Sequence, residues 1–252
     1  MEHKTVGFAV CGSFCTHHRA MEALEAVKAR YDHVIPIVSE VVADTDTRFG
    51  TAHDLMREME RICDHRVIAT QKEAEPIGPK GLLDLLIIAP CTGSTLGKLA
   101  CGIADNLLLT TYLSARCPVV VSPAMDLDMY AHPATQENLR RLAERGVRIV
   151  QPAEGELASG LTGKGRMAEP ADIAAFVGQL FGGENPEKKK SLQGRRFVVT
   201  AGATIEAIDP VRFISNHSTG KMGYAIAGAL AARGGDVTLV SGRTALPTPA
   251  GV

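Results

Sequence analysis

The chain has 252 residues and a mass of 26.7 kDa, and its 27 Lys and Arg residues against 28 Asp and Glu residues give a formal net charge of −1. Hydrophobic residues make up 45% and charged residues 22%, which is ordinary globular composition and leaves no basic surplus to bind nucleic acid or an acidic membrane. No apolar run approaches the ~20 residues of a membrane helix, and the start of the chain does not resemble a secretory leader. We therefore expect a cytoplasmic protein with reduced cysteines and no nucleic-acid or membrane partner.

Short aliphatic and β-branched runs alternate with helical patterns along residues 1–181. The runs lack polar alternation, so we interpret them as strands buried on both faces of a parallel sheet. They are Thr5–Val10, His33–Val38, Leu83–Ala89, Pro118–Val121 and Val147–Val150. The helical patterns cover Arg19–Ala29, His53–Cys63, Ser94–Ala104, Leu107–Ala115, Ala134–Arg145 and Pro170–Phe181. This order predicts an α/β fold with a doubly wound, Rossmann-like parallel sheet.

Residues 182–194 hold almost nothing that a core could bury and carry a run of charges, which indicates a linker. A strand at Arg196–Thr200, a helix at Lys221–Arg233 and a strand at Asp236–Val240 follow. Residues 195–252 are thus predicted to form a second α/β unit that looks truncated, because no further strands complete its sheet.

Two turns at predicted strand ends carry hydroxyl groups. Ligands of open α/β sheets lie beyond the carboxyl ends of the strands, where free amides and helix N-termini attract anions. The first turn contains Gly12 and Ser13, and the second contains Thr92, Ser94 and Thr95. We predict that both hold one phosphate-bearing ligand; the alternative is that hydroxyls such as those of Thr16 and Ser94 only cap helices. Neither turn has a Gly-x-Gly-x-x-Gly or Walker pattern.

A compact cysteine and histidine cluster near the first strand end raises the question of a metal site. Cys11, Cys15, His17 and His18 have suitable ligand atoms, but their spacing does not match a zinc site. We predict buried thiols and no metal.

The glycine-rich segment 152–169 is longer than most structureless loops inside a domain, which indicates a functional loop. Lys164 and Arg166 suit an anionic substrate, and the glycines suit the hinges of a lid. A solvated loop is the alternative.

Motifs in two overlapping parts of the chain resemble two branches of one family, the FMN-binding cysteine decarboxylases. KLACGIADNLLLTTYLSA, PAMDLDMYAHPATQENL, GELASGLTGKGRMAEP and TAGATIEAIDPVRFISNHSTGKMGYAIA, within residues 83–252, resemble bifunctional phosphopantothenoylcysteine decarboxylase/phosphopantothenate-cysteine ligases of coenzyme A biosynthesis. VGFAVCGSFCTHH, TDTRFG and AEPIGPKGLLDLLIIAPCTG, within residues 4–99, are similar to the B-type subunit of dipicolinate synthase.

The resemblance implies a homo-oligomer, a trimer or a multiple of one, that binds FMN near the boundaries between its protomers and acts on a small molecule. It places the flavin contacts on Gly12, Ser13, Ser39, Thr92, Ser94, Thr95, Lys98, Ala124 and Met125. It places a substrate lid on Gly160, Lys164, Arg166 and Met167, and ligase-like positions on Asp209, Asn216 and Lys221.

The resemblance also implies catalytic positions, at which this sequence departs from many decarboxylases. Asp126 stands where they have Asn, and Ser159 stands where they have Cys. Their histidine, about eight residues before the Asp that leads a strand, aligns with Pro76 when Asp84 is matched. An FMN-dependent decarboxylase with an inactive, incomplete ligase part is the leading hypothesis. The alternatives are a dipicolinate synthase B-type subunit that oxidises dihydrodipicolinate and a non-catalytic flavin-binding subunit.

Overall fold

The computed structural model describes residues 2–157, 160–181 and 192–252. The chain divides into two compact units, Met1–Phe181 and Gly182–Val252, and each is described by itself. Ser159 and most of the predicted linker lie outside the described residues.

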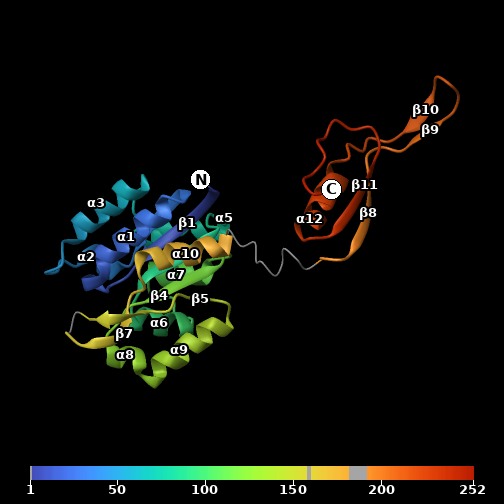
Figure 1. The fold of residues 1–252 in the computed structure, drawn as a ribbon. Coiled ribbons are helices and arrows are strands. Elements are labelled where there is room, and N and C mark those ends of the chain that lie inside the picture. The colour runs from blue at the N-terminus through green and yellow to red at the C-terminus, as the bar shows by residue number, and fades with distance from the viewer. Residues whose placement is uncertain (1, 158–159, 182–191) are drawn as a thin grey trace. The chain divides into compact units, whose positions relative to one another are not determined.

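A five-stranded parallel sheet with the order β2-β1-β3-β4-β5 forms the centre of the first unit (Figure 1). Its strands are β1 (Glu2–Val10), β2 (Tyr31–Val38), β3 (Leu85–Cys91), β4 (Val119–Pro123) and β5 (Arg148–Ile149). Every residue of β3 and β4 is buried, as their unbroken apolar runs predict. The predicted doubly wound α/β fold is confirmed.

Helices flank this sheet and connect its strands. They are α1 (His17–Lys28), α2 (Glu40–Asp44), α3 (Ala52–Cys63), α4 (Gln71–Ala74), α5 (Ile77–Lys80), α6 (Gly93–Cys101), α7 (Leu107–Ser114), α8 (Leu127–Ala131), α9 (Pro133–Glu144) and α10 (Pro170–Phe181), with a short 3-10 turn, η1 (Phe14–Thr16). The sequence patterns did not predict α2, α4, α5 and α8, which have four or five residues each and are too short for a helical period to show. None of the described helices is long and apolar enough to cross a membrane.

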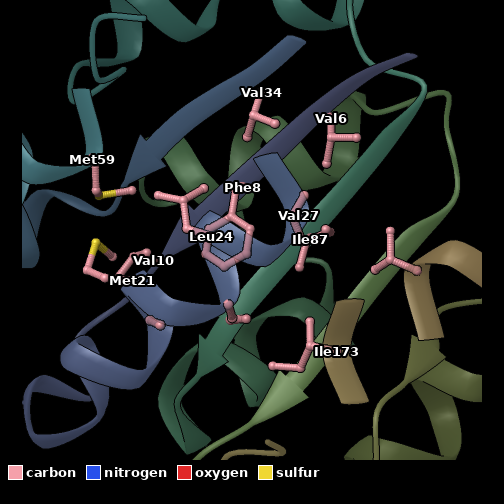
Figure 2. Close-up of a cluster of buried hydrophobic side chains, with 14 of the residues drawn as sticks. Val6, Phe8, Val10, Met21, Leu24, Val27, Val34, Met59, Ile87 and Ile173 are labelled. Atoms are coloured by element: carbon pink, nitrogen blue, oxygen red, sulfur yellow. The ribbon is translucent and has the colours of Figure 1, made fainter. Parts of the chain in front are cut away.

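Apolar side chains cover both faces of the sheet. Successive residues of a strand point to opposite faces, so Phe8 of β1 packs on one side with Leu24 of α1 and Ile173 of α10 (Figure 2). Ile88 of β3 packs on the other side, in the cluster that holds Leu96 of α6. The helices that follow β1 and β3 therefore cover opposite faces, and the chain leaves a crevice between the carboxyl ends of these two strands. In open α/β sheets this switch point is where ligands bind.

Segment 152–169 is mostly not an irregular loop, which corrects the sequence-based prediction. It contains an antiparallel hairpin of β6 (Ala153–Glu156) and β7 (Thr162–Arg166). The strand predicted at Leu83–Ala89 extends further than expected: β3 continues through Pro90 to Cys91, although the β3–β4 register shifts between Ile88 and Cys91.

The second unit contains a parallel pair of strands, β8 (Arg196–Ala201) and β11 (Asp236–Ser241), packed with helix α12 (Lys221–Ala232). A small antiparallel hairpin, β9 (Ile205–Ala207) with β10 (Phe213–Ser215), lies between β8 and α12 in the chain. The predicted strand, helix and strand are all present; the hairpin, with only three residues in each strand, was not predicted.

Candidate functional site

The thiol of Cys11 joins the ends of the two central strands. Its Sγ donates to the carbonyl oxygen of Pro90 at 2.9 Å and accepts a hydrogen bond from the amide of Thr92 at 3.3 Å. Burial raises the pKa of the Cys11 thiol, so the group stays protonated at neutral pH and keeps its donor role. The two turns that follow β1 and β3 are thereby held side by side.

A cavity of about 760 Å³ opens at this junction. Its lining contains all nine positions that the sequence analysis assigned to the flavin: Gly12, Ser13, Ser39, Thr92, Ser94, Thr95, Lys98, Ala124 and Met125. We call this space the strand-end cavity. Ser39 is the residue there whose hydrogen bonding is incomplete, because its Oγ is buried and has no partner within the described chain. A ligand hydrogen bond at Ser39 would remove that energetic penalty.

The N-terminus of α6 faces the strand-end cavity. Thr92 is the N-cap: its Oγ1 accepts from the amide of Thr95 at 3.2 Å and donates to Thr95 Oγ1 at 3.0 Å. The amides of Gly93 and Ser94 have no intrahelical partner at this position, and the helix dipole favours an anion there. A hydroxyl does cap α6, as the alternative interpretation expected, but the capping residue is Thr92 and not Ser94. The side chain of Thr16, the other residue named there, makes no capping hydrogen bond.

Lys98 is the cationic residue in the lining of the strand-end cavity, and it already forms an ion pair with an acidic residue of the chain. Lys98 Nζ lies 2.6 Å from Asp105 Oδ2, and both side chains are partly exposed. Nearby, Glu40 Oε1 accepts from the amide of Leu107 and so holds α2 against the start of α7.

A second cavity, of about 840 Å³, adjoins the first. We call it the arginine cavity, because Arg19, Arg48 and Arg166 line it from three different elements. The two cavities share Gly12, Ser13, Phe14, Ala124 and Met125. The arginine cavity is further lined by Cys15, Thr16, Phe49, Asp126, Glu156, Leu157, Gly165 and Met167.

The β6–β7 hairpin is docked on the loop that follows β4. The amide of Met125 donates to the carbonyl oxygen of Gly165 at 3.0 Å. Gly165 has a φ of +152°, and a Cβ there would lie 2.6 Å from the Met125 carbonyl oxygen, so only glycine permits this approach. Gly163 is equally close to α8, because its Cβ would lie 2.6 Å from Leu127 Cδ1.

A carboxylate between two guanidinium groups holds the base of the hairpin. Glu169 Oε2 lies 2.5 Å from an Arg19 nitrogen, and Glu169 Oε1 accepts from Arg166. The hydrogen bond from Arg166 lowers the pKa of the Glu169 carboxyl, and the charge of Arg19 adds to the effect. One negative charge thus faces two positive charges at this edge of the arginine cavity.

Of the four predicted lid residues, the structure brings two to the arginine cavity. Arg166 and Met167 line it. Lys164 instead lies over the ring of Tyr130, with Nζ 5.9 Å from the ring centroid, and Gly160 is exposed near the tip of the hairpin. Lys164 and Gly160 are not in the lining of either cavity.

The predicted catalytic positions are only partly described. Asp126 lines the arginine cavity and caps α8, because its Oδ1 accepts from the amide of Leu127 at 2.8 Å. Pro76 is the N-cap residue of α5 and lines neither cavity. Histidine is missing from the described lining of both cavities, so the general base expected of a decarboxylase has no histidine candidate there. Ser159 lies outside the described residues.

The ligase-like positions of the second unit are engaged in local contacts. Asp209 accepts from the amides of Val211 and Arg212, and these bonds lower the pKa of its carboxyl, the Val211 amide most. Asn216 Oδ1 accepts from the amide of Ser218. Lys221 is exposed in the first turn of α12. The described contacts bring no two of Asp209, Asn216 and Lys221 together.

Sequence reasoning missed two exposed residues of the arginine cavity, Arg48 and Phe49. Both lie on the loop between α2 and α3, and the only signal for them was an arginine and an aromatic residue in front of Gly50 within TDTRFG. Phe49 stays 52% exposed beside the cavity, where its aromatic ring offers a flat apolar surface to a ligand.

Comparison with known proteins places the chain among flavoproteins. Residues 2–182 match the flavoprotein family, and residues 192–252 match the DNA/pantothenate metabolism flavoprotein C-terminal domain. A cysteine/cysteine sulfinic acid decarboxylase from an unknown prokaryotic organism is 60% identical over 163 residues, 65% of this chain and 45% of the relative. The coenzyme A biosynthesis bifunctional protein CoaBC of Bacillus subtilis (strain 168) is 48% identical over 169 residues, 67% of this chain and 41% of the relative. The chain spans less than half the length of these curated relatives.

Solved structures show similarity to both predicted branches. A mutant of PPC decarboxylase complexed with pantothenoylaminoethenethiol has a TM-score of 0.59 and 26% identity, and the match covers 73% of this chain and 100% of that one. The B-type subunit of dipicolinate synthase from Bacillus halodurans C has a TM-score of 0.56 and 26% identity, with coverage of 72% and 92%. The resemblance that the motifs predict is confirmed for both branches.

Proposed function

The chain belongs to the flavoprotein family, and from that premise we propose that it binds FMN in the strand-end cavity and decarboxylates a substrate that carries a cysteine carboxylate. The observation that carries this proposal is the gathering of both hydroxyl-bearing turns at one cavity between the carboxyl ends of β1 and β3. The cysteine and PPC decarboxylases among its relatives support the reaction type.

The residues of the strand-end cavity fit a flavin with a single phosphate. The unpartnered Oγ of Ser39, the hydroxyl of Thr95 and the α6 amides at Gly93 and Ser94 provide donors for phosphate oxygens. Met125 and Met129 provide polarisable, apolar surface of the kind that a flat ring system contacts. The absence of a Gly-x-Gly-x-x-Gly turn favours FMN over a dinucleotide.

When bound, the flavin supplies the capacity to accept the electrons removed from the substrate's cysteine. The chain's own residues then have three tasks. Asp126, in the lining of the arginine cavity, is placed to accept a hydrogen bond from the substrate. Arg166, whose charge Glu169 already offsets, lines the cavity where it would orient the substrate's carboxylate without a strong ion pair to it. The hairpin held by the Met125–Gly165 bond covers the arginine cavity and limits the access of water.

Two measurements test this proposal. The purified protein is incubated with FMN and passed through a gel-filtration column, and we expect a flavin absorption spectrum to elute with the protein. The loaded protein is then given phosphopantothenoylcysteine, cysteine or cysteine sulfinate, and we expect carbon dioxide release from at least one of them. Retained flavin without carbon dioxide from any of the three would refute the decarboxylase proposal while leaving FMN binding intact.

A second function is favoured by one specific observation, the Pro76 that stands in place of the decarboxylase histidine. The structural match to the B-type subunit of dipicolinate synthase and the motif AEPIGP support a dihydrodipicolinate oxidase that acts with a partner chain. Formation of dipicolinate from dihydrodipicolinate, with an A-type subunit present, would support it. If that reaction and decarboxylation are both absent and the flavin is retained, the protein is a non-catalytic flavin carrier.

We also propose that the protein is a homo-oligomer, a trimer or a multiple of one. Val41 and Met129, each 51% exposed, form an apolar part of the strand-end cavity that a second copy would cover. Sedimentation analysis of the flavin-loaded protein tests this, and a purely monomeric species would contradict it.

A further inference from the structure

Arg48 and Phe49 are the two central residues of a tight, well-anchored turn. The amide of Thr47 donates to the carbonyl oxygen of Gly50 at 3.0 Å, and the Gly50 amide donates back to the Thr47 oxygen at 3.2 Å. The amide of Phe49 also donates to Thr47 Oγ1 at 3.2 Å. These bonds restrict the turn before any ligand arrives, which lowers the entropic cost of binding at its tip.

The guanidinium group of Arg48 lies over the ring of Phe49, 4.8 Å from the ring centroid. No ion pair links it to a carboxylate of the described chain, whereas Arg19 and Arg166 share Glu169. A stacked guanidinium keeps its N–H groups free at the edge, in the planar arrangement that binds a carboxylate, sulfinate or phosphate through two parallel hydrogen bonds.

The arginine cavity therefore has two separate sources of positive charge. One is the Arg19–Glu169–Arg166 group at the base of the hairpin, and the other is Arg48 on the turn between α2 and α3. We propose that Arg48, supported by Phe49, is a specificity-determining subsite that binds a second anionic group of the substrate, one that the reaction does not remove. This inference rests on the proposed function and names its substrate class: molecules with two anionic groups.

The chemistry of decarboxylation explains why Arg48 is assigned the group that stays. A carboxylate loses its negative charge as carbon dioxide departs, so a strong ion pair to it stabilises the substrate more than the transition state. An arginine that holds a remote anion stabilises both equally and contributes to binding without opposing the reaction. The anion that stays is the phosphate in phosphopantothenoylcysteine, far from the carboxylate, and the sulfinate on Cβ in cysteine sulfinate.

Two substrate pairs, each differing by the second anion, test the subsite. The first pair is phosphopantothenoylcysteine and pantothenoylcysteine, and the second is cysteine sulfinate and cysteine. For the pair that the protein turns over, we expect wild type to prefer the more anionic member in kcat/KM. Arg48→Gln should reduce that preference roughly 10- to 100-fold through KM, since hydrogen bonds to charged groups contribute about that factor. Arg48→Lys, which keeps the charge but not the planar fork, should lie between.

Arg57→Gln is the matched control, because Arg57 is an exposed arginine of α3 that lines neither cavity. It removes the same charge from the same region and should leave the preference unchanged. If both Arg48→Gln and Arg57→Gln change the preference, general electrostatic attraction explains it and the subsite is overturned. An unchanged preference in Arg48→Gln would overturn the subsite as well.

Failure of the proposed function is distinguishable from failure of this inference. If no substrate releases carbon dioxide, the flavin-loaded protein is titrated calorimetrically with the same pairs. Tighter binding of the more anionic member that is lost in Arg48→Gln supports the subsite without turnover. Equal binding of both members by wild type overturns it. The pair that responds identifies whether the second anion is a phosphate or a sulfinate.

Discussion

Substitutions of Thr92 and Thr95 can distinguish helix capping from cofactor binding at the strand-end cavity. Thr92 Oγ1 accepts from the Thr95 amide and donates to Thr95 Oγ1, so it both caps α6 and orients the Thr95 hydroxyl. Thr95 Oγ1 is the acceptor of that bond, so its own proton can be donated, and a bound phosphate, as a charged acceptor, would compete for it with the Cys11 thiol. Thr95→Val should weaken FMN binding roughly 10-fold, because a hydrogen bond to a charged group contributes about 1.5 kcal/mol or more, and should change stability little.

Thr92→Val removes both the helix cap and the hydrogen bond that orients the Thr95 hydroxyl. Loss of a threonine cap costs about 1 kcal/mol, which lowers the Tm of a unit of this size by about 2–4 °C. Thr70→Val is the control for that part, since Thr70 caps α4 in the same unit and lines neither cavity. We expect Thr70→Val to lower Tm alone, Thr95→Val to weaken FMN binding alone, and Thr92→Val to do both.

Flavin fluorescence quenching measures the FMN dissociation constant, and a thermal melt of the flavin-free protein measures Tm. The result that would refute the reasoning is a Thr95→Val variant that binds FMN as wild type does. The turn after β3 would then be a helix start and not a phosphate site, and the hydroxyls there would serve the fold alone.

Three further predictions follow from the hairpin and the cysteines. Gly165→Ala should detach the hairpin and lower the free energy of unfolding by about 1–3 kcal/mol. The loss should exceed that of Gly160→Ala, which shares the strain of a positive φ (+81°) but whose added Cβ meets no atom within 4 Å. Equal losses in chemical denaturation would contradict a role for the close contact at Gly165. The pKa of the Glu169 carboxyl is lowered in the folded protein, so its contribution to stability is present above about pH 4 and is lost as the pH falls below that. The Tm of Glu169→Gln should therefore lie below that of wild type at pH 7, and the difference should shrink in melts at acidic pH. A difference that does not depend on pH would exclude the ion pairs as its cause. Iodoacetamide should label the exposed Cys15 of the native protein and spare the buried Cys11, which peptide mass spectrometry can measure. Equal labelling of the two would mean that the junction between the ends of β1 and β3 is open to solvent.

Much of the fold could be predicted because its signals are local. Helix α10 has the predicted bounds, since its apolar period and its leading Pro170 are both visible in the sequence. The hairpin β6–β7 was missed for a physical reason: Gly155, Gly163 and Gly165 have low strand propensity and hide any alternation. Tertiary contacts fix it instead, chiefly the bond from the Met125 amide to Gly165.

The candidate site divides in the same way. Residues that directly follow β1 and β3 could be found from the sequence, because the carboxyl ends of parallel strands meet at one edge of the sheet. Arg48 and Phe49 could not, since nothing local indicates that the turn after α2 reaches the same cavity as Arg166. Their position depends on how α2 and α3 pack, which is a property of the whole fold.

The loop after β4 belongs to both cavities and is hydrogen-bonded to the hairpin through Met125 and Gly165. A ligand in either cavity that orders this loop makes the other cavity easier to occupy. Such coupling is reciprocal by thermodynamic necessity. Cofactor loading should therefore strengthen substrate affinity by the same factor by which bound substrate strengthens cofactor affinity. A protein short of flavin would then also release its ligand in the arginine cavity more readily.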